Sequence, residues 1–257
     1  MSEPVRTLQV GTARVEIYES KEKLGQAAAR TAANIMQNTL KQNEVANVAF
    51  ATGASQFEFV DALGDEHINW QRIVAFHLDE YLGMQDDHPA SFRRWLRERI
   101  VERYAPRAVH YVQGDADDAE VEAARYSRLL EQNPVHLGCV GIGENGHIAF
   151  NDPPVADFSD PHKVKVVELD HACRMQQLGE GWFPTLDDVP HRALTLTVPA
   201  IMQFQHIVSV VPDERKAEAV KNALQGEMTT RCPASILRTH PNLTMFLDEG
   251  SASLLTV

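Results

Sequence analysis

Short apolar runs alternate along the chain with longer segments in which apolar residues recur at helical spacing. Residues 13–18 alternate apolar and polar side chains, which predicts a strand. Ser20 is the expected N-cap of a helix of about five turns that reaches Thr39. The apolar run 45–51 then predicts a buried strand, and a helical stretch is expected from Gln56 to Leu63.

The same alternation continues to the end of the chain. Further strands are predicted at 73–78, from Pro134 to Gly143, and at 164–169, 193–198, 206–211 and 242–247. Further helices are predicted over 89–101, from the polar turn 114–118 to about Glu131, and over 215–224. Strands that alternate with helices form parallel βαβ units, so we expect an α/β fold in one domain spanning 1–257. In such sheets, ligands bind beyond the carboxyl ends of the strands.

The composition narrows the class of protein. The 257 residues carry 24 Lys and Arg against 36 Asp and Glu, a net charge of −12, which argues against a nucleic-acid or anionic-membrane surface. The N-terminus lacks the apolar segment of a signal peptide, and no run is long enough to span a membrane. The three cysteines form no CxxC pair and the eleven histidines no HExxH motif, so we expect reduced thiols, a cytoplasmic protein and no metal site.

A glycine-rich segment, Gly141-Ile-Gly-Glu-Asn-Gly-His-Ile-Ala-Phe-Asn-Asp152, carries the clearest candidate chemistry. It follows the apolar run 137–140, and its glycines allow a tight turn and a close approach of a ligand to the backbone. His147 can exchange a proton near neutral pH, and Asp152 can orient it. The alternative is a neutral histidine satisfied by backbone hydrogen bonds.

Asp79 and Glu80 follow the predicted strand 73–78 directly. A carboxylate in a partly dry pocket can act as a general base, whereas the structural alternative is a helix or turn cap. His77, inside the apolar run, is expected in the core.

Two further segments could hold an anion. Thr52-Gly53-Ala54-Ser55 joins a predicted strand to a helix, where free N–H groups and two hydroxyls could bind a phosphate, although an ordinary cap with a turn glycine would look the same. Lys216, at a loop-to-helix junction, could neutralise a phosphate or be an ordinary exposed lysine. A basic helix face is expected to be solvated or to meet another subunit: Arg93, Arg94, Arg97 and Arg99.

Taken together, these segments resemble the glucosamine-6-phosphate deaminase (isomerase) family. The resemblance spans nearly the whole chain and rests on residues 51–55, Phe76-His-Leu-Asp-Glu-Tyr-Leu-Gly83, His88-Pro-Ala-Ser-Phe92 and 141–153. It implies a Rossmann-like, doubly wound, mostly parallel sheet with helices on both faces. It also implies conversion of an amino-sugar 6-phosphate to a ketose 6-phosphate and ammonia, with no metal or organic cofactor. The related 6-phosphogluconolactonases share the fold and a similar glycine-rich loop, without the Asp-Glu-Tyr-x-Gly block.

The resemblance also implies roles for single residues. Asp79 matches the acid–base residue that moves a proton between C2 and C1, and His147 matches the histidine that assists ring opening. Asp152 and Asn145 stand where the family has a glutamate and an aspartate of the same relay. The implied substrate and phosphate contacts are Thr52, Gly53, Ala54, Ser55, Gly146 and Lys216.

The chain departs from the family pattern in ways that leave other functions open. Asn145 cannot ionise, Asp152 is one methylene shorter than glutamate, and the family's phosphate-binding arginine has no clear counterpart near Arg174. The alternatives are a 6-phosphogluconolactonase-type hydrolase, with His147 activating water, and a non-catalytic sugar-phosphate sensor. The expected partner is a small sugar phosphate, and the chain could assemble as a homo-oligomer.

Overall fold

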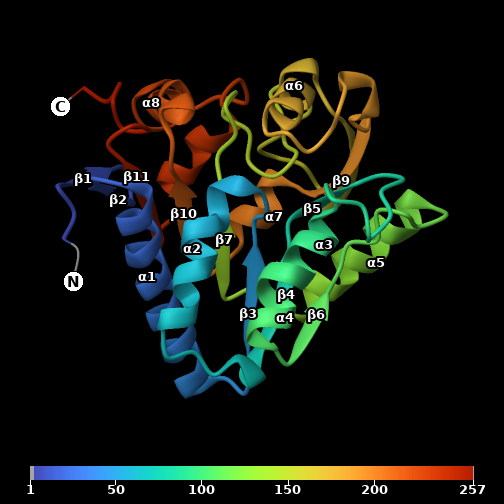
Figure 1. Cartoon of the computed structure of the whole chain (residues 1–257), viewed down its shortest axis with the longest axis horizontal. Helices are drawn as coiled ribbons and strands as arrows, with labels where there is room; N and C mark the ends of the chain where they lie inside the picture. Colours follow the sequence, from blue (N-terminus) through green and yellow to red (C-terminus); the bar gives the residue numbers. More distant parts are fainter. Residues whose placement is uncertain (1–2, 257) are drawn as a thin grey trace.

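The computed structural model describes residues 3–256, and its centre is an eight-stranded sheet (Figure 1). All neighbouring strands pair in parallel except the first two, which form an antiparallel pair at one edge. The predicted α/β fold with a mostly parallel sheet is therefore confirmed. Across the sheet the order is β1 (Arg6–Val10), β2 (Ala13–Tyr18), β11 (Leu243–Asp248), β10 (His206–Val211), β7 (Leu137–Val140), β3 (Ala46–Phe50), β4 (Ile73–His77) and β6 (Ala108–His110).

Helices cover both faces of this sheet, as the doubly wound prediction requires. Successive residues of β10 point to opposite faces of the sheet. Val208 packs in an apolar cluster on one face, and Ile207 packs in an apolar cluster on the other. The first cluster is completed by helices α1 (Lys21–Gln42), α2 (Phe57–Ala62) and α3 (Phe92–Leu96). The second is completed by α5 (Ala119–Gln132), α7 (Val198–Met202) and α8 (Ala217–Gln225).

A second, three-stranded sheet lies beyond the carboxyl end of β4 (Figure 1). It is antiparallel and has the order β5 (Asp79–Tyr81), β9 (Arg192–Leu196), β8 (Val164–Glu168). The chain leaves β4 at His77 and enters β5 two residues later, so the predicted strand 73–78 feeds both sheets. This small sheet fixes the backbone of Asp79, which pairs with Thr195.

The helix predicted over 89–101 begins later than the periodicity suggested. Ser91 is its N-cap, with Oγ accepting a hydrogen bond from the Arg94 amide. The helix then continues as a π-helical segment, Arg97–Val101, and as α4 (Glu102–Tyr104). The strand predicted from Pro134 to Gly143 is also shorter than expected. Only Leu137–Val140 forms strand β7, and the residues on either side of it lie in loops.

Several elements had no clear periodic signal. These are β1, β6 and α7, which are short, and α6 (His171–Gly179), which follows the N-cap Asp170. Short 3₁₀ helices complete the chain at Ala54–Gln56, Leu63–Asp65, Trp70–Arg72, Leu186–Asp188, Glu214–Lys216 and Pro233–Thr239. Among residues 3–256, no helix is both long and apolar enough to cross a bilayer.

Candidate active site

Four neighbouring strands of the large sheet end at one cavity. The segments that follow β3, β4, β7 and β10 supply Thr52, Asp79, Gly141 and Lys216 respectively. Between β3 and β7 the strand order reverses direction, which is where doubly wound sheets bind ligands. The cavity is open to solvent at its mouth, and its volume of about 590 Å³ includes this open part. It is lined by Ala51, Thr52, Gly53, Ala54, Ser55, Leu78, Asp79, Phe92, Gly141, Ile142, Gly143, His147, Ala149, Phe150, Gln176, Gln177, Glu180 and Lys216.

Asp79 is a buried carboxyl group on the wall of this cavity, with 6% of the residue exposed. Burial raises the pKa of its carboxyl well above the ordinary value, and the nearby Glu80 and Asp152 carboxylates raise it further. A carboxylate with a raised pKa in a dry site has the properties of a general base.

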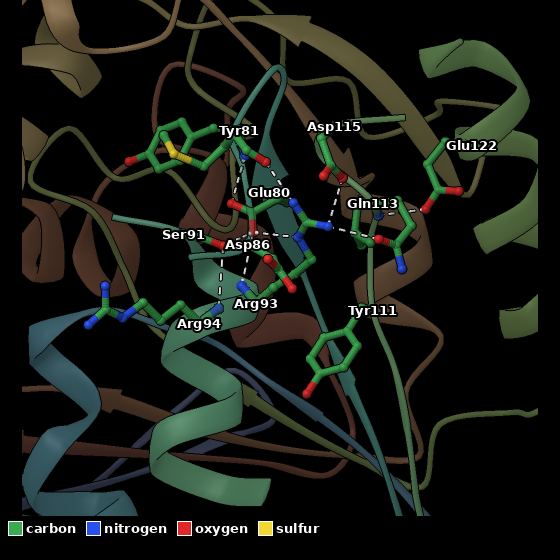
Figure 2. Close-up of polar contacts among 12 residues, drawn as sticks. Glu80, Tyr81, Asp86, Ser91, Arg93, Arg94, Tyr111, Gln113, Asp115 and Glu122 are labelled. Carbon is green, nitrogen blue, oxygen red and sulfur yellow. Dashed lines mark hydrogen bonds and ion pairs between the residues drawn. The ribbon is translucent and has the colours of Figure 1, made fainter. Parts of the chain in front are cut away.

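Glu80 has a different position and a different set of contacts (Figure 2). It is completely buried, and its carboxylate accepts hydrogen bonds from the amides of Tyr81 (3.0 Å), Phe92 (3.1 Å) and Arg93 (2.9 Å), and from Ser91 Oγ (2.8 Å). These donors include the first amides of α3. The cap interpretation of the acidic pair is therefore right for Glu80, whereas Asp79 lines the cavity.

Arg93 corrects the prediction that all four arginines of this helix are solvated or meet another subunit. It is 5% exposed, and its guanidinium bonds Asp115 Oδ1 (2.7 Å), Gln113 Oε1 (2.8 Å) and the Met84 carbonyl (2.6 Å) (Figure 2). Its Nε also lies 3.6 Å from Glu80 Oε2. Arg93 lies in the first turn of α3, where its side chain faces inward, while the other three remain on the outer surface: Arg94, Arg97 and Arg99.

The glycine-rich loop holds His147 beside Asp152 and Asn145. The Nδ1 atom of His147 lies 2.9 Å from Asp152 Oδ1, and the same oxygen accepts a hydrogen bond from Asn145 Nδ2 (3.0 Å). Asn145 Oδ1 in turn accepts from the His147 amide (3.0 Å). Burial alone would raise the pKa of Asp152, but the contacts with His147 and Asn145 outweigh it and lower the pKa. The three predicted residues thus form one cluster, of which His147 reaches the cavity.

Two glycines of this loop have steric reasons to be glycine. A Cβ at Gly143 would lie 2.1 Å from His147 Cε1. Gly146 has a φ of +84°, and a Cβ there would lie 2.7 Å from Cys232 Sγ. Gly146 is therefore explained by backbone conformation and packing, and it does not itself line the cavity.

The predicted phosphate contacts lie at the other part of the cavity. Gly53 has a φ of +101°, and no side chain caps the 3₁₀ turn that follows it, whose residues Ala54 and Ser55 line the cavity. Gln56 Nε2 donates to Ser55 Oγ (3.0 Å) and to the Val210 carbonyl (3.2 Å), which ties this turn to β10.

Lys216 lines the same part of the cavity and is 4% exposed, so the exposed-lysine alternative is wrong. Burial lowers the pKa of its ammonium, and the Glu180 and Glu144 carboxylates act in the opposite direction. A buried ammonium at an otherwise uncapped turn provides a site for an anion.

Sequence reasoning missed the wall that α6 contributes. Gln176, Gln177 and Glu180 line the cavity, and Gln176 connects the wall to the glycine-rich loop by accepting from the Glu144 amide (2.9 Å). Arg174, on the same helix, turns away and donates to the carbonyls of Leu186 and Val189. Among the described residues, those that line the cavity include no arginine. The available signal was the Asp170 cap, whose Oδ1 accepts from the Cys173 amide (2.7 Å).

The remaining predictions concern core positions. His77 is fully buried, as predicted, and its Nε2 accepts from the Val112 amide (2.8 Å). Burial, with the charge of Arg93, lowers the pKa of His77 to about 3, so the ring is neutral. All three cysteines are free and buried.

Comparison with known proteins agrees with this geometry. The family model described as glucosamine-6-phosphate isomerases/6-phosphogluconolactonase matches residues 19–245. The chain belongs to this family. Among its relatives, a glucosamine-6-phosphate deaminase of Bacillus cytotoxicus is 34% identical over 93% of this chain and 87% of its own length. The corresponding protein of Listeria monocytogenes serotype 4a is 30% identical over 94% of this chain and 100% of its own.

Solved structures give the same assignment. A monomeric glucosamine-6-phosphate deaminase superposes with a TM-score of 0.84 at 31% identity, covering 94% of this chain and 99% of that one. A 6-phosphogluconolactonase from Shewanella baltica gives a TM-score of 0.75 at 17% identity over 94% of this chain and 97% of its own, a likeness of fold.

Proposed function

We propose that the chain is an amino-sugar phosphate deaminase that converts glucosamine 6-phosphate, or a close relative, to fructose 6-phosphate and ammonia. The observation that carries this proposal is that Asp79 and His147 line one cavity. Residues 52–55 and Lys216, which line the same cavity, form what we call its anion end. Relatives named glucosamine-6-phosphate deaminase, 30–37% identical over most of the chain, support the same reaction.

Ring opening is the first step of the proposed reaction. The His147 imidazole, oriented by Asp152, accepts the proton of the C1 hydroxyl and delivers a proton to the ring oxygen. Asn145 acts as a positioning residue, because it bonds both the His147 backbone and the Asp152 carboxylate. Since Asn145 is neutral, it fixes this pair without adding a second negative charge.

Isomerisation follows at the buried Asp79 carboxylate. It removes the proton from C2 of the open-chain aldose, the electrons of that bond form the C1–C2 double bond, and the C1 carbonyl oxygen takes up a proton from solvent, which gives an enol amine. Return of the Asp79 proton to C1, with loss of one N–H proton to solvent, gives the ketose imine at C2. Water then adds to the imine and ammonia leaves, which yields the ketose phosphate.

The substrate phosphate occupies the other part of the cavity in this proposal. The amides and hydroxyls of residues 52–55 supply hydrogen bonds, and Lys216 supplies the positive charge. The α6 wall contributes the neutral amides of Gln176 and Gln177, next to the Glu180 carboxylate.

Incubation of the purified protein with glucosamine 6-phosphate tests the proposal, with ammonia and fructose 6-phosphate measured in parallel. Equimolar release of both products is the expected result. Folded protein that releases neither from glucosamine 6-phosphate or its amino-hexose epimers would exclude the reaction.

The same preparation separates the two alternatives. Hydrolysis of 6-phosphogluconolactone above the spontaneous rate would identify a lactonase. Tight binding of sugar phosphates without turnover of either substrate would identify a sensor.

A further inference from the structure

Three potential metal ligands from two segments of the chain meet next to the cavity: a nitrogen of His147, a carboxylate oxygen of Asp152 and Sγ of Cys173. These three atoms all lie within 4.8 Å of one another, and all three residues are buried. The first two belong to the glycine-rich loop and the third to the first turn of α6. Histidine spacing alone could not reveal this cluster, because its thiol comes from a helix 21 positions beyond Asp152.

The hydrogen bonding of the cluster is incomplete. Although His147 Nδ1 lies 2.9 Å from Asp152 Oδ1, neither that nitrogen nor Asp152 Oδ2 has an aligned hydrogen-bond partner among residues 3–256. Asp152 is completely buried, and its one further contact in the cluster is the weak thiol donor of Cys173, which helps to lower the pKa of this carboxyl. Buried polar atoms without a strong partner are unfavourable. A cation within reach of both atoms would satisfy them.

The donor set indicates which cation fits. One imidazole nitrogen, one thiolate and one carboxylate are typical ligands of zinc, whereas magnesium and calcium take oxygen ligands. With a neutral imidazole, a thiolate and a carboxylate, Zn²⁺ would make the buried group electrically neutral. Cys173 is completely buried and packs in the hydrophobic cluster that contains Tyr81 and Phe183, so its thiol is shielded from bulk water.

We propose that His147, Asp152 and Cys173 form a three-ligand site for Zn²⁺ or a similar borderline-soft divalent cation. Zn²⁺ would reach the site through the cavity, which His147 lines. Its fourth coordination position would then face the cavity. Binding forms a zinc–sulfur bond and releases the thiol proton to solvent. The bound ion coordinates His147 and Asp152, so the imidazole cannot transfer a proton and the enzyme is inhibited. The inhibition rests on the proposed function, whereas the metal binding does not.

Co²⁺ substitution tests the site without any reference to activity. Addition of Co²⁺ to the reduced, metal-free protein is expected to produce a near-ultraviolet thiolate-to-cobalt charge-transfer band that Zn²⁺ abolishes. Cys173→Ser should remove this band and lower the affinity for Zn²⁺ by about tenfold or more. The double variant Cys139→Ala/Cys232→Ala, which leaves Cys173 as the only thiol, should retain the band.

Activity measurements then test the inhibition. Zn²⁺ should inhibit the full-length protein reversibly, with recovery on addition of EDTA and no inhibition by the same concentration of Mg²⁺. Each variant is compared with its own chelator-treated activity, so an effect of the substitution on turnover cancels.

Two results would overturn the proposal: no charge-transfer band in the natural protein, or the same band in Cys173→Ser. If Cys173→Ser fails to fold, the double variant decides, because loss of its band would assign the metal to another thiol. An inactive protein that still shows the cobalt band would refute the deaminase proposal and leave the metal site standing.

Discussion

Asp79 and Glu80 are consecutive residues of β5 whose carboxylates serve opposite sides of the strand. The Asp79 side chain lines the cavity, while the Glu80 carboxylate accepts hydrogen bonds from the first backbone amides of α3. Side chains of a strand alternate in this way, so the pair places one carboxylate on the reaction side and one on the supporting side. The supporting contacts fix the backbone on which Asp79 is carried.

Asp79→Asn is expected to lower kcat by about 10²- to 10⁴-fold, because an amide cannot accept the proton of C2. Steady-state kinetics with glucosamine 6-phosphate provide the measurement, and binding of a non-reactive sugar phosphate should change little. Near-normal turnover would rule out Asp79 as the base.

The raised pKa of Asp79 also gives this variant a signature in stability. A carboxyl group whose pKa is higher in the folded than in the unfolded state favours folding below its unfolded pKa, and this contribution is lost as the pH rises through the folded pKa. At neutral pH, Asp79→Asn should therefore raise Tm, with the gain disappearing in acid. The acid limb of kcat/KM in the natural enzyme should likewise lie above the ordinary pKa of aspartate.

Arg93→Met is expected to lower the free energy of unfolding by about 3–5 kcal/mol, since it leaves Glu80 buried beside a lost counter-charge. Arg94→Met is the matched control, because the partly exposed Arg94–Glu98 pair should contribute no more than about 1 kcal/mol. Urea unfolding of the two variants provides the comparison. Equal losses of unfolding free energy in the two variants would mean that buried Arg93 contributes no more stability than a surface arginine.

Gly143→Ala is expected to displace the His147 ring, because the new Cβ would lie 2.1 Å from Cε1. The predicted result is a fall in kcat of about tenfold or more, since misplaced catalytic groups lose rate steeply. Gly179→Ala, at the end of α6, is the control: nothing lies within 4 Å of its Cβ position. A loss confined to Gly143→Ala supports the steric argument, whereas full activity there would contradict it.

Lys216→Met is expected to raise KM about 10- to 100-fold, the loss of one charge-assisted hydrogen bond to phosphate. It should also raise Tm at neutral pH, because burial lowers the pKa of this ammonium and so disfavours the charged, folded form. Lys221→Met, on the exposed side of α8, should change neither quantity. An unchanged KM in Lys216→Met would remove this residue from the phosphate site.

Most strands of the large sheet could be predicted from the sequence, because buried parallel strands appear as apolar runs and their flanking helices appear as amphipathic segments. The same logic placed the Thr52, Asp79 and His147 loops at strand ends, and they do share one cavity. It could not separate Asp79 from Glu80, since opposite faces of a three-residue strand leave no periodic signal.

Other features depended on contacts between distant segments. Arg93 faces inward because Asp115 and Gln113, on a later loop, bind its guanidinium. The α6 wall and the approach of Cys173 to Asp152 depend equally on packing that no local pattern encodes. The small antiparallel sheet is of the same kind, because β5 is short and its partner β9 is more than 100 residues away.

The hydrogen bond from Gln56 to the Val210 carbonyl joins two halves of the chain that are separated by 154 positions. A fragment that contains both residues 52–55 and Lys216 must therefore span at least residues 52–216, and the two come together only when the intervening strands are in place. A sugar phosphate that binds there stabilises the assembled sheet as a unit. Saturating ligand should accordingly slow hydrogen exchange in β3, β7 and β10 together, including amides that never touch it.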